Sequence, residues 1–142
     1  MDNNSIKVRL VKPSDLDFID QESHLSREKK LAKIRQGEVL LLIVNDEPVG
    51  HLWFDFLWSE IPFIELIRIQ ETHRKKGLSR ALLGFLETHL KNMGYDILYS
   101  SSQLDEPEPQ AWHRQMGFEE CGMINGLNEG GIGEVFFRKS LS

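Results

Sequence analysis

Apolar residues alternate with polar ones along several short stretches of the chain, and this spacing predicts half-buried strands. In the first stretch, Lys7 and Arg9 separate three aliphatic residues. The clearest pair of stretches is divided by the turn residues Asn45–Pro48, which predicts a hairpin. We expect strands at Ile6–Leu10, Glu38–Val44, Val49–Phe56, Phe63–Gln70, Ile97–Ser101 and Gly133–Lys139.

From Leu78 to Met93 the apolar residues recur at three- and four-residue steps, the signature of an amphipathic helix, and Gly94 is placed to end it. Shorter helices are expected at Ser14–Glu22, at Arg27–Arg35 before Gly37, and at Pro109–Met116. The order β-α-α-β-β-β-α-β-α-β-β, which includes one further strand between the last helix and Gly133–Lys139, predicts an α/β (α+β) fold with one mixed sheet covered by helices.

The composition is that of a single globular domain, residues 1–142, with 40% hydrophobic and 27% charged residues. A net charge of −5 argues against a general nucleic-acid binder. The lone cysteine, Cys121, excludes an internal disulfide and a cysteine-rich zinc site, and we expect it to be a small buried residue. No signal peptide or membrane span is evident, and the histidines lack metal-ligand spacing. We therefore expect a cytoplasmic protein without a membrane partner or a metal.

The segment Ile67–Leu82 carries the most chemical information, because a strand runs through a basic turn directly into the best helix. Backbone N–H groups at a helix N-terminus attract phosphate, and small residues at 77 and 79 allow a ligand to approach closely. Between Arg68 and Arg80 the net charge is +4, so the rest of the chain carries −9. The basic charge is therefore concentrated at one place.

Two other interpretations of this turn remain open on residue chemistry alone. Arg74, Lys75 and Lys76 can be a solvated turn before a surface helix, or the turn can bind a nucleotide or a phosphate. It is not a Walker loop, because the Gly-x4-Gly-Lys-Ser/Thr pattern is absent.

Arg74-x-x-Gly77-x-Ser79 resembles the Gln/Arg-x-x-Gly-x-Gly/Ala acetyl-CoA motif of the GNAT N-acetyltransferase superfamily. The segment Ala111–Phe118 resembles the helix and Gly-Phe segment near the end of that fold, and the order of elements matches over nearly the whole chain. The resemblance implies a mixed, mostly antiparallel sheet of six to seven strands flanked by about four helices.

The resemblance also implies that acetyl-CoA is the co-substrate and that a primary amine attacks its thioester directly in a ternary complex. Backbone amides of the turn would hold the pyrophosphate, the strand before it would pair with the pantetheine arm, and a strand amide would polarise the thioester carbonyl. The implied cofactor-binding residues are Ile67, Arg68, Ile69, Arg74, Lys75, Lys76, Gly77, Leu78, Ser79 and Arg80.

The chain departs from the family pattern at three positions. Ser79 replaces the usual Gly or Ala, Glu106 stands where an asparagine is common, and His113 stands where a tyrosine usually protonates the leaving thiolate. A histidine can donate a proton, so His113 is the candidate acid, although it can equally be a packing residue. Glu65 is the candidate general base, because it shares an otherwise apolar face of its strand.

Several side chains are weaker candidates for the acceptor site. His51 and Asp55 lie on the hairpin strand, and the aromatic cluster Trp53–Trp58 is expected to be mainly core or dimer contact. The acceptor can be a small amine or a peptide amine, and a homodimer is left open. The alternative function is a non-catalytic acyl-CoA-binding or sensing module, which the missing tyrosine favours.

Overall fold

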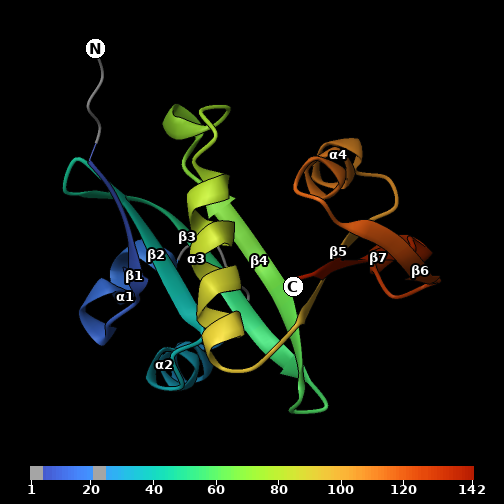
Figure 1. The fold of residues 1–142 in the computed structure, drawn as a ribbon, viewed down its shortest axis with the longest axis horizontal. Helices are drawn as coiled ribbons and strands as arrows, with labels where there is room; N and C mark the ends of the chain where they lie inside the picture. Colours follow the sequence, from blue (N-terminus) through green and yellow to red (C-terminus); the bar gives the residue numbers. More distant parts are fainter. Residues whose placement is uncertain (1–4, 21–24) are drawn as a thin grey trace. The chain divides into compact units, whose positions relative to one another are not determined.

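The computed structural model describes residues 5–20 and 25–142 (Figure 1). Its strands are β1 Ile6–Leu10, β2 Val39–Val44, β3 Glu47–Leu57, β4 Ile61–Ile69, β5 Ile97–Gln103, β6 Glu119–Ile124 and β7 Glu134–Ser140. Its α-helices are α1 Leu16–Ile19, α2 Arg27–Arg35, α3 Ser79–Asn92 and α4 Pro107–Gln115. Short 3-10 turns are η1 Pro13–Asp15, η3 Glu71–His73 and η4 Glu129–Gly131.

The strands form one seven-stranded sheet in the order β1-β2-β3-β4-β5-β7-β6. Neighbours β1/β2, β2/β3, β5/β7 and β6/β7 are antiparallel, whereas β4 and β5 are parallel, with Phe63 opposite Tyr99. The sheet is therefore mixed and mostly antiparallel. The expected element order and the expected six to seven strands with about four helices are confirmed.

The chain divides into two compact units, and the division falls inside β3, β4 and α3. Unit 1 comprises Met1–Phe54 and Leu66–Thr88, and unit 2 comprises Asp55–Glu65 and His89–Ser142.

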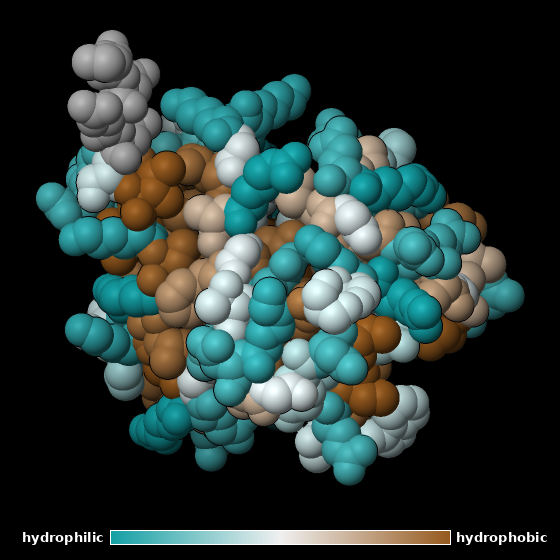
Figure 2. Space-filling model, in the orientation of Figure 1, coloured by the Kyte–Doolittle hydropathy of each residue, from teal (hydrophilic) through white to brown (hydrophobic). Residues whose placement is uncertain are grey.

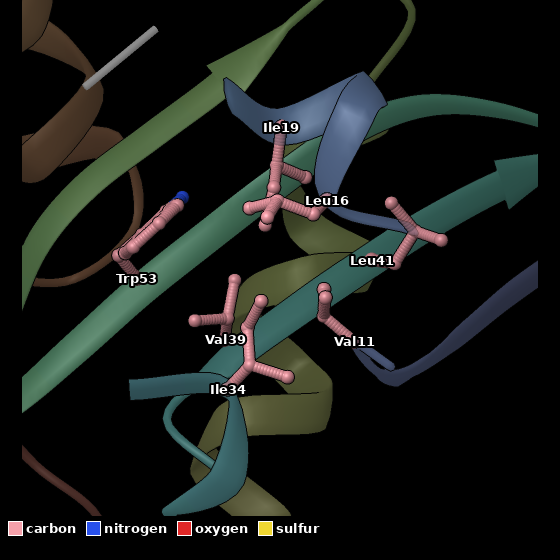
Figure 3. Packing of buried hydrophobic residues seen from close by; sticks show 7 residues of the cluster. All are labelled: Val11, Leu16, Ile19, Ile34, Val39, Leu41 and Trp53. Carbon is pink, nitrogen blue, oxygen red and sulfur yellow. The ribbon is translucent and has the colours of Figure 1, made fainter. Parts of the chain in front are cut away.

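In unit 1, helices α1 and α2 cover one face of β2 and β3. Their buried side chains form a cluster with the strands (Figure 3): Val11, Leu16, Ile19, Ile34, Val39, Leu41 and Trp53. The ribbon that has the colour of α3 passes behind the strands in this view, so α3 lies on the opposite face. Side chains on β2 therefore alternate between two buried faces, which explains its continuous apolar sequence.

The spacing of apolar residues in helix α3 determines which side of the helix is buried. Leu82 and Leu86 are fully buried, whereas Arg80, Gly84 and Thr88 are exposed. On the face seen in Figure 2, hydrophilic and intermediate side chains cover the part of the surface over α3. Gly94 follows with φ +96°, the left-handed conformation expected at the end of a helix.

In unit 2, β5 pairs with β7 over seven register positions, and Phe63 of β4 lies 5.9 Å from Phe136 between ring centroids. Helix α4 begins at Pro107, which has no N–H to leave unpaired in the first turn. The residues that anchor the end of α4 and the following turn are buried: His113, Met116 and Phe118.

Most predicted boundaries agree with the structure to within a few residues. The helix expected at Ser14–Glu22 is observed as η1 and α1, and Gln21 and Glu22 lie outside the described residues. The turn residues Asn45 and Asp46 have positive φ angles, and Pro48 already belongs to β3.

The prediction that Cys121 is buried is wrong. Cys121 is exposed, because β6 is the outermost strand of the sheet and all six of its residues are exposed. Local sequence did not reveal that this strand lies at an edge.

No helix among residues 5–20 and 25–142 is long and apolar enough to cross a membrane.

Candidate functional site

The basic turn of unit 1 connects the end of β4 to the start of α3. It passes through η3 and then takes left-handed conformations at Lys75 (φ +62°) and Gly77 (φ +72°) before α3 begins at Ser79. A left-handed residue next to right-handed or extended ones turns successive N–H groups toward one side, which forms an anion-binding concavity.

Four consecutive backbone N–H groups in this turn, those of residues 75–78, have no acceptor within the described part of the chain. The carbonyls of Gly77 and Leu78, in contrast, accept hydrogen bonds from Arg80 and Ala81. A row of unpaired donors at the positive end of a helix is a site suited to a phosphate or a pyrophosphate.

The charged side chains of the turn are directed to solvent. Arg74, Lys75, Lys76 and Arg80 are exposed, whereas Leu78 is buried at 8% exposure. The Nε atom of Arg74 donates to the carbonyl oxygen of Ile69 at 2.8 Å, which ties the start of the turn to the end of β4. A β-carbon added at Gly77 would meet no atom within 4 Å, so the space beside this residue is open.

The end of β4, residues 67–69, comes unusually close to β3 at Gly50. A β-carbon added at Gly50 would lie 2.8 Å from Ile69 Cδ1 and 2.9 Å from the carbonyl oxygen of Arg68. Only glycine allows this approach, so Gly50 positions the strand that leads into the basic turn. The sequence analysis did not single out Gly50, although a glycine inside an apolar strand was a signal for close backbone approach.

His51 is a buried, neutral residue of unit 1. Its Nδ1 atom accepts a hydrogen bond from Trp53 Nε1 at 2.8 Å, and its ring packs edge-on against Phe18. Burial, and to a smaller extent the charge of Arg68, lowers the pKa of His51 to about 4. Within unit 1, His51 is therefore a core residue whose Nδ1 atom accepts the hydrogen bond donated by the buried Trp53 indole.

His113 lies in unit 2 at 3% exposure, and both of its ring nitrogens have partners. Nδ1 lies 2.7 Å from the carbonyl oxygen of Pro109, and Nε2 lies 2.7 Å from Ser100 Oγ. Its ring stacks on Phe137 with 4.4 Å between centroids and 4° between planes. A carbonyl can only accept, so Nδ1 carries the proton and Nε2 accepts from the serine hydroxyl.

The surroundings of His113 favour its neutral form. Burial lowers the pKa of His113 to about 4, although the hydrogen bond to Pro109 and the charge of Glu134 act in the opposite direction. Ser100, which fixes the ring, was not among the predicted site residues. The run of three serines after Tyr99 was a sequence signal for polar contacts inside the sheet.

Glu65, the candidate base, lies on β4 within unit 2 and is exposed. Its neighbours Ile64 and Pro62 are buried, whereas Phe63 is half-buried, as expected for alternating faces of a strand. Asp55 is exposed in the same unit. Of the aromatic residues that follow His51, Trp53 and Phe54 belong to the core, while Trp58 is 83% exposed.

A second carboxylate of unit 2 was missed by the sequence analysis. Glu134 of β7 accepts a hydrogen bond from Ser101 Oγ at 2.6 Å and another from Asn128 Nδ2 at 2.9 Å. Ser101 lies on β5, 33 residues before Glu134, so no local motif connects these two residues.

The structure thus distributes the predicted residues over both units. The predicted cofactor-binding residues, 67–69 and 74–80, lie in unit 1, and Glu65 and His113 lie in unit 2. Within residues 5–20 and 25–142, no group of three or more metal-ligating side chains could hold a metal ion.

Comparisons with solved structures support the same architecture. An acetyltransferase of the GNAT family from Bacillus cereus is 22% identical, with a TM-score of 0.80 and coverage of 96% of this chain and 97% of that chain. The ribosomal-protein-S18-alanine N-acetyltransferase of Escherichia coli is 19% identical, with a TM-score of 0.79 and coverage of 97% and 95%.

A third structure, the protein yncA from Salmonella typhimurium, was solved with its cofactor acetyl-CoA. It is 16% identical, with a TM-score of 0.81 and coverage of 97% of this chain and 95% of that chain. A comparison with curated protein sequences gives no match.

The family model for acetyltransferases of the GNAT family matches residues 9–118, which include the strand, the basic turn, the helix and the Gly-Phe segment described above. A match over this much of the chain, together with the shared fold, means that the chain belongs to the GNAT family of acetyltransferases.

Proposed function

We propose that this acetyltransferase transfers the acetyl group of acetyl-CoA to a primary amine. The observation that carries the proposal is the row of unpaired N–H groups at residues 75–78, flanked by exposed cations. Such a site fits the pyrophosphate of CoA, which carries negative charge and many acceptor oxygens. The acetyl-CoA in the Salmonella relative supports the same co-substrate.

In this proposal the residues of the turn bind and orient the co-substrate. Residues 75–78 donate backbone N–H groups to the pyrophosphate, and Arg74, Lys76 and Arg80 add positive charge. The backbone of Ile67–Ile69 pairs with the pantetheine arm as an extended ligand pairs with a strand. A backbone amide of β4 polarises the thioester carbonyl.

Glu65 is proposed as the general base. The acceptor enters as an ammonium ion, and its nitrogen must lose one proton before it can attack the thioester carbon. After attack the C–S bond breaks, the nitrogen releases a second proton, and the leaving sulfur gains one. One proton is thus released overall, and Glu65 accepts the first.

The contacts of His113 favour a positioning role over the role of acid predicted from the sequence. A neutral ring whose only N–H points to Pro109 is poorly suited to protonate a thiolate at pH 7. We therefore propose that His113 is a positioning residue for β5 and α4, and that the sulfur takes the second proton released by the attacking nitrogen, through water. Residues 1–142 then act as one functional domain in which a histidine stands at position 113, where the family resemblance implies a tyrosine.

The acceptor class rests on the amine chemistry of the family. The Escherichia coli relative, by its name, acetylates an alanine of ribosomal protein S18, so peptide amines remain candidates beside small amines. The alternative function, an acyl-CoA-binding module without turnover, is favoured by one observation, the engaged and neutral His113.

The test measures binding and turnover separately. We expect acetyl-CoA to raise the melting temperature of the protein, whereas ATP at equal concentration has little effect, because ATP lacks the pantetheine arm. Thiol release across a library of amines then reports transfer. Stabilisation by ATP equal to that by acetyl-CoA would support a general phosphate site, and binding without amine-dependent thiol release would support the non-catalytic module.

A further inference from the structure

The carboxylate of Glu134 is held in place by two neutral donors. Ser101 Oγ donates to Oε2 at 2.6 Å and Asn128 Nδ2 donates to Oε1 at 2.9 Å. The same Nδ2 lies 3.2 Å from the carbonyl oxygen of Ile132 and 3.4 Å from that of Gly133. Because these oxygens can only accept, the nitrogen of the Asn128 amide faces Glu134. The carboxylate therefore has a fixed position and orientation.

The negative charge of Glu134 has no counter-ion in the described part of the chain. None of the lysine, arginine or histidine side chains in residues 5–20 and 25–142 forms an ion pair with it. Glu134 is nevertheless half-buried on β7. A carboxylate that is partly removed from water is usually paired with a cation. Without a cation, the burial of this charge costs free energy.

Each oxygen of Glu134 has capacity for a further donor. An ionised carboxylate offers about four lone-pair sites, and the two hydrogen bonds use one on each oxygen. An incoming cationic N–H group could therefore bind without displacing Ser101 or Asn128.

Aromatic side chains flank this carboxylate on the same face of the sheet. Phe136 lies two positions further along β7, directly opposite Ser101, and its ring contacts that of Phe63. The alternation of β4 places Glu65 on the face that Phe63 occupies. A carboxylate beside aromatic rings suits an alkylammonium group, because the charge of that group can contact the carboxylate while its methylene carbons pack against the rings.

We propose that Glu134 binds a cationic group of the acetyl acceptor, and that Ser101 and Asn128 position it. This inference rests on the proposed function. The nitrogen that attacks must be neutral, whereas a carboxylate favours a protonated amine. Glu134 therefore holds a second ammonium group that stays charged throughout the reaction. The acceptor class is then that of aliphatic diamines and polyamines.

The test compares 1,5-diaminopentane with pentylamine, which has the same carbon chain and lacks the second ammonium group. We expect the wild-type protein to prefer the diamine in kcat/KM. Glu134→Gln should reduce kcat/KM for the diamine by ~10- to 100-fold, mainly through KM, because a charge-assisted contact is lost. Its kcat/KM for pentylamine and its KM for acetyl-CoA should change less than about twofold.

Two further sets of variants separate binding from folding. Ser101→Ala and Asn128→Ala should each lower the diamine preference by a few fold, and this effect should vanish in the Glu134→Gln background. Glu129→Gln, at an exposed carboxylate of the neighbouring turn η4, serves as the matched control and should leave the preference unchanged. A preference that survives in Glu134→Gln overturns the proposal, as does an equal loss for both amines.

If the protein does not transfer an acetyl group to either amine, the Glu134 site is tested by binding alone. If neither amine supports thiol release, calorimetric titration of 1,5-diaminopentane into the protein tests the site directly. Binding that weakens at least ~10-fold in Glu134→Gln would support the site without transfer, and equal or absent binding in both proteins would overturn it.

Discussion

Ser100 and His113 form a hydrogen bond inside unit 2, with 2.7 Å between Ser100 Oγ and His113 Nε2. Both residues are almost fully buried, at 2% and 3% exposure. The bond joins β5 to α4 and, with the contact to Pro109, determines which ring nitrogen carries the proton. His113 is therefore a neutral part of the core of this unit, and this has consequences for stability.

The first prediction concerns acid stability. The pKa of His113 is about 4 in the folded protein, below its ordinary value of 6.5, so between these values the unfolded chain binds a proton that the folded chain does not. The free energy of unfolding should fall as the pH drops from 6.5 to 4, by about 3 kcal/mol for this residue. His51, with its pKa also near 4, acts in the same direction.

Urea denaturation at pH values from 7.5 to 4 checks this prediction. The double variant Ser100→Ala/His113→Phe removes the histidine without leaving the serine unpaired, and its stability should depend less on pH than that of the wild type. The carboxyl groups with lowered pKa values, Asp15 and Asp20, begin to lose their stabilising effect near the acid end of this range, and they do so in the wild type and the double variant alike. An unchanged pH profile in the double variant would contradict the prediction.

The second prediction concerns the basic turn. Gly77→Asp adds bulk and negative charge where the proposed pyrophosphate lies, so the Kd for acetyl-CoA should rise by ~100-fold or more. Gly77→Ala adds no charge, but it strains a residue with φ +72° by about 1–2 kcal/mol, and a smaller loss is expected. Isothermal titration calorimetry measures both.

Gly84→Asp provides the matched control for the turn. Gly84 is exposed on α3, and a β-carbon there meets no atom within 4 Å. This variant carries the same new charge and should bind acetyl-CoA with wild-type affinity. An unaltered affinity in Gly77→Asp would remove the turn as the cofactor site.

The third prediction concerns Gly50. In Gly50→Ala the new methyl group would meet the Arg68 carbonyl oxygen at 2.9 Å, and backbone gives way less easily than a side chain. We expect a loss of about 1–3 kcal/mol in the free energy of unfolding and weaker acetyl-CoA binding, because residues 67–69 must shift. Gly122→Ala, in the exposed strand β6 with no atom within 4 Å, should change neither quantity. Wild-type stability in Gly50→Ala would show that the two strands adjust without cost.

The fourth prediction concerns Glu65. Glu65→Gln removes the proposed base, so kcat should fall by ~10²- to 10⁴-fold while the Kd for acetyl-CoA stays the same. Because more of the acceptor amine is neutral at high pH, the loss should shrink as the pH approaches the pKa of the amine. Steady-state thiol release between pH 6 and pH 10 measures both effects. Glu60→Gln, at an exposed carboxylate between β3 and β4, is the control. A pH-independent loss in Glu65→Gln would indicate a structural role in place of proton transfer.

The fold could be predicted from the sequence to a large extent, because local spacing decides which segments can bury an apolar face. The three- and four-residue steps from Leu78 specify α3, and the alternation in Ile6–Leu10 specifies β1. The basic turn could also be predicted, since strand, cations, glycine and helix follow one another directly in the chain. These features depend on neighbours in sequence.

Only the tertiary structure decided what surrounds individual side chains. The contacts of His113 with Ser100 and of Glu134 with Ser101 join different elements of the chain, and Asn128 reaches Glu134 from the loop before β7. The exposure of Cys121 depends on β6 being the outermost strand. Strand order and register determine these environments, and they are set by pairing across the whole sheet. Residue type and spacing thus located the proposed cofactor turn, whereas burial and long-range pairing determined that His113 is neutral and that Glu134 lacks a counter-ion in the described part of the chain.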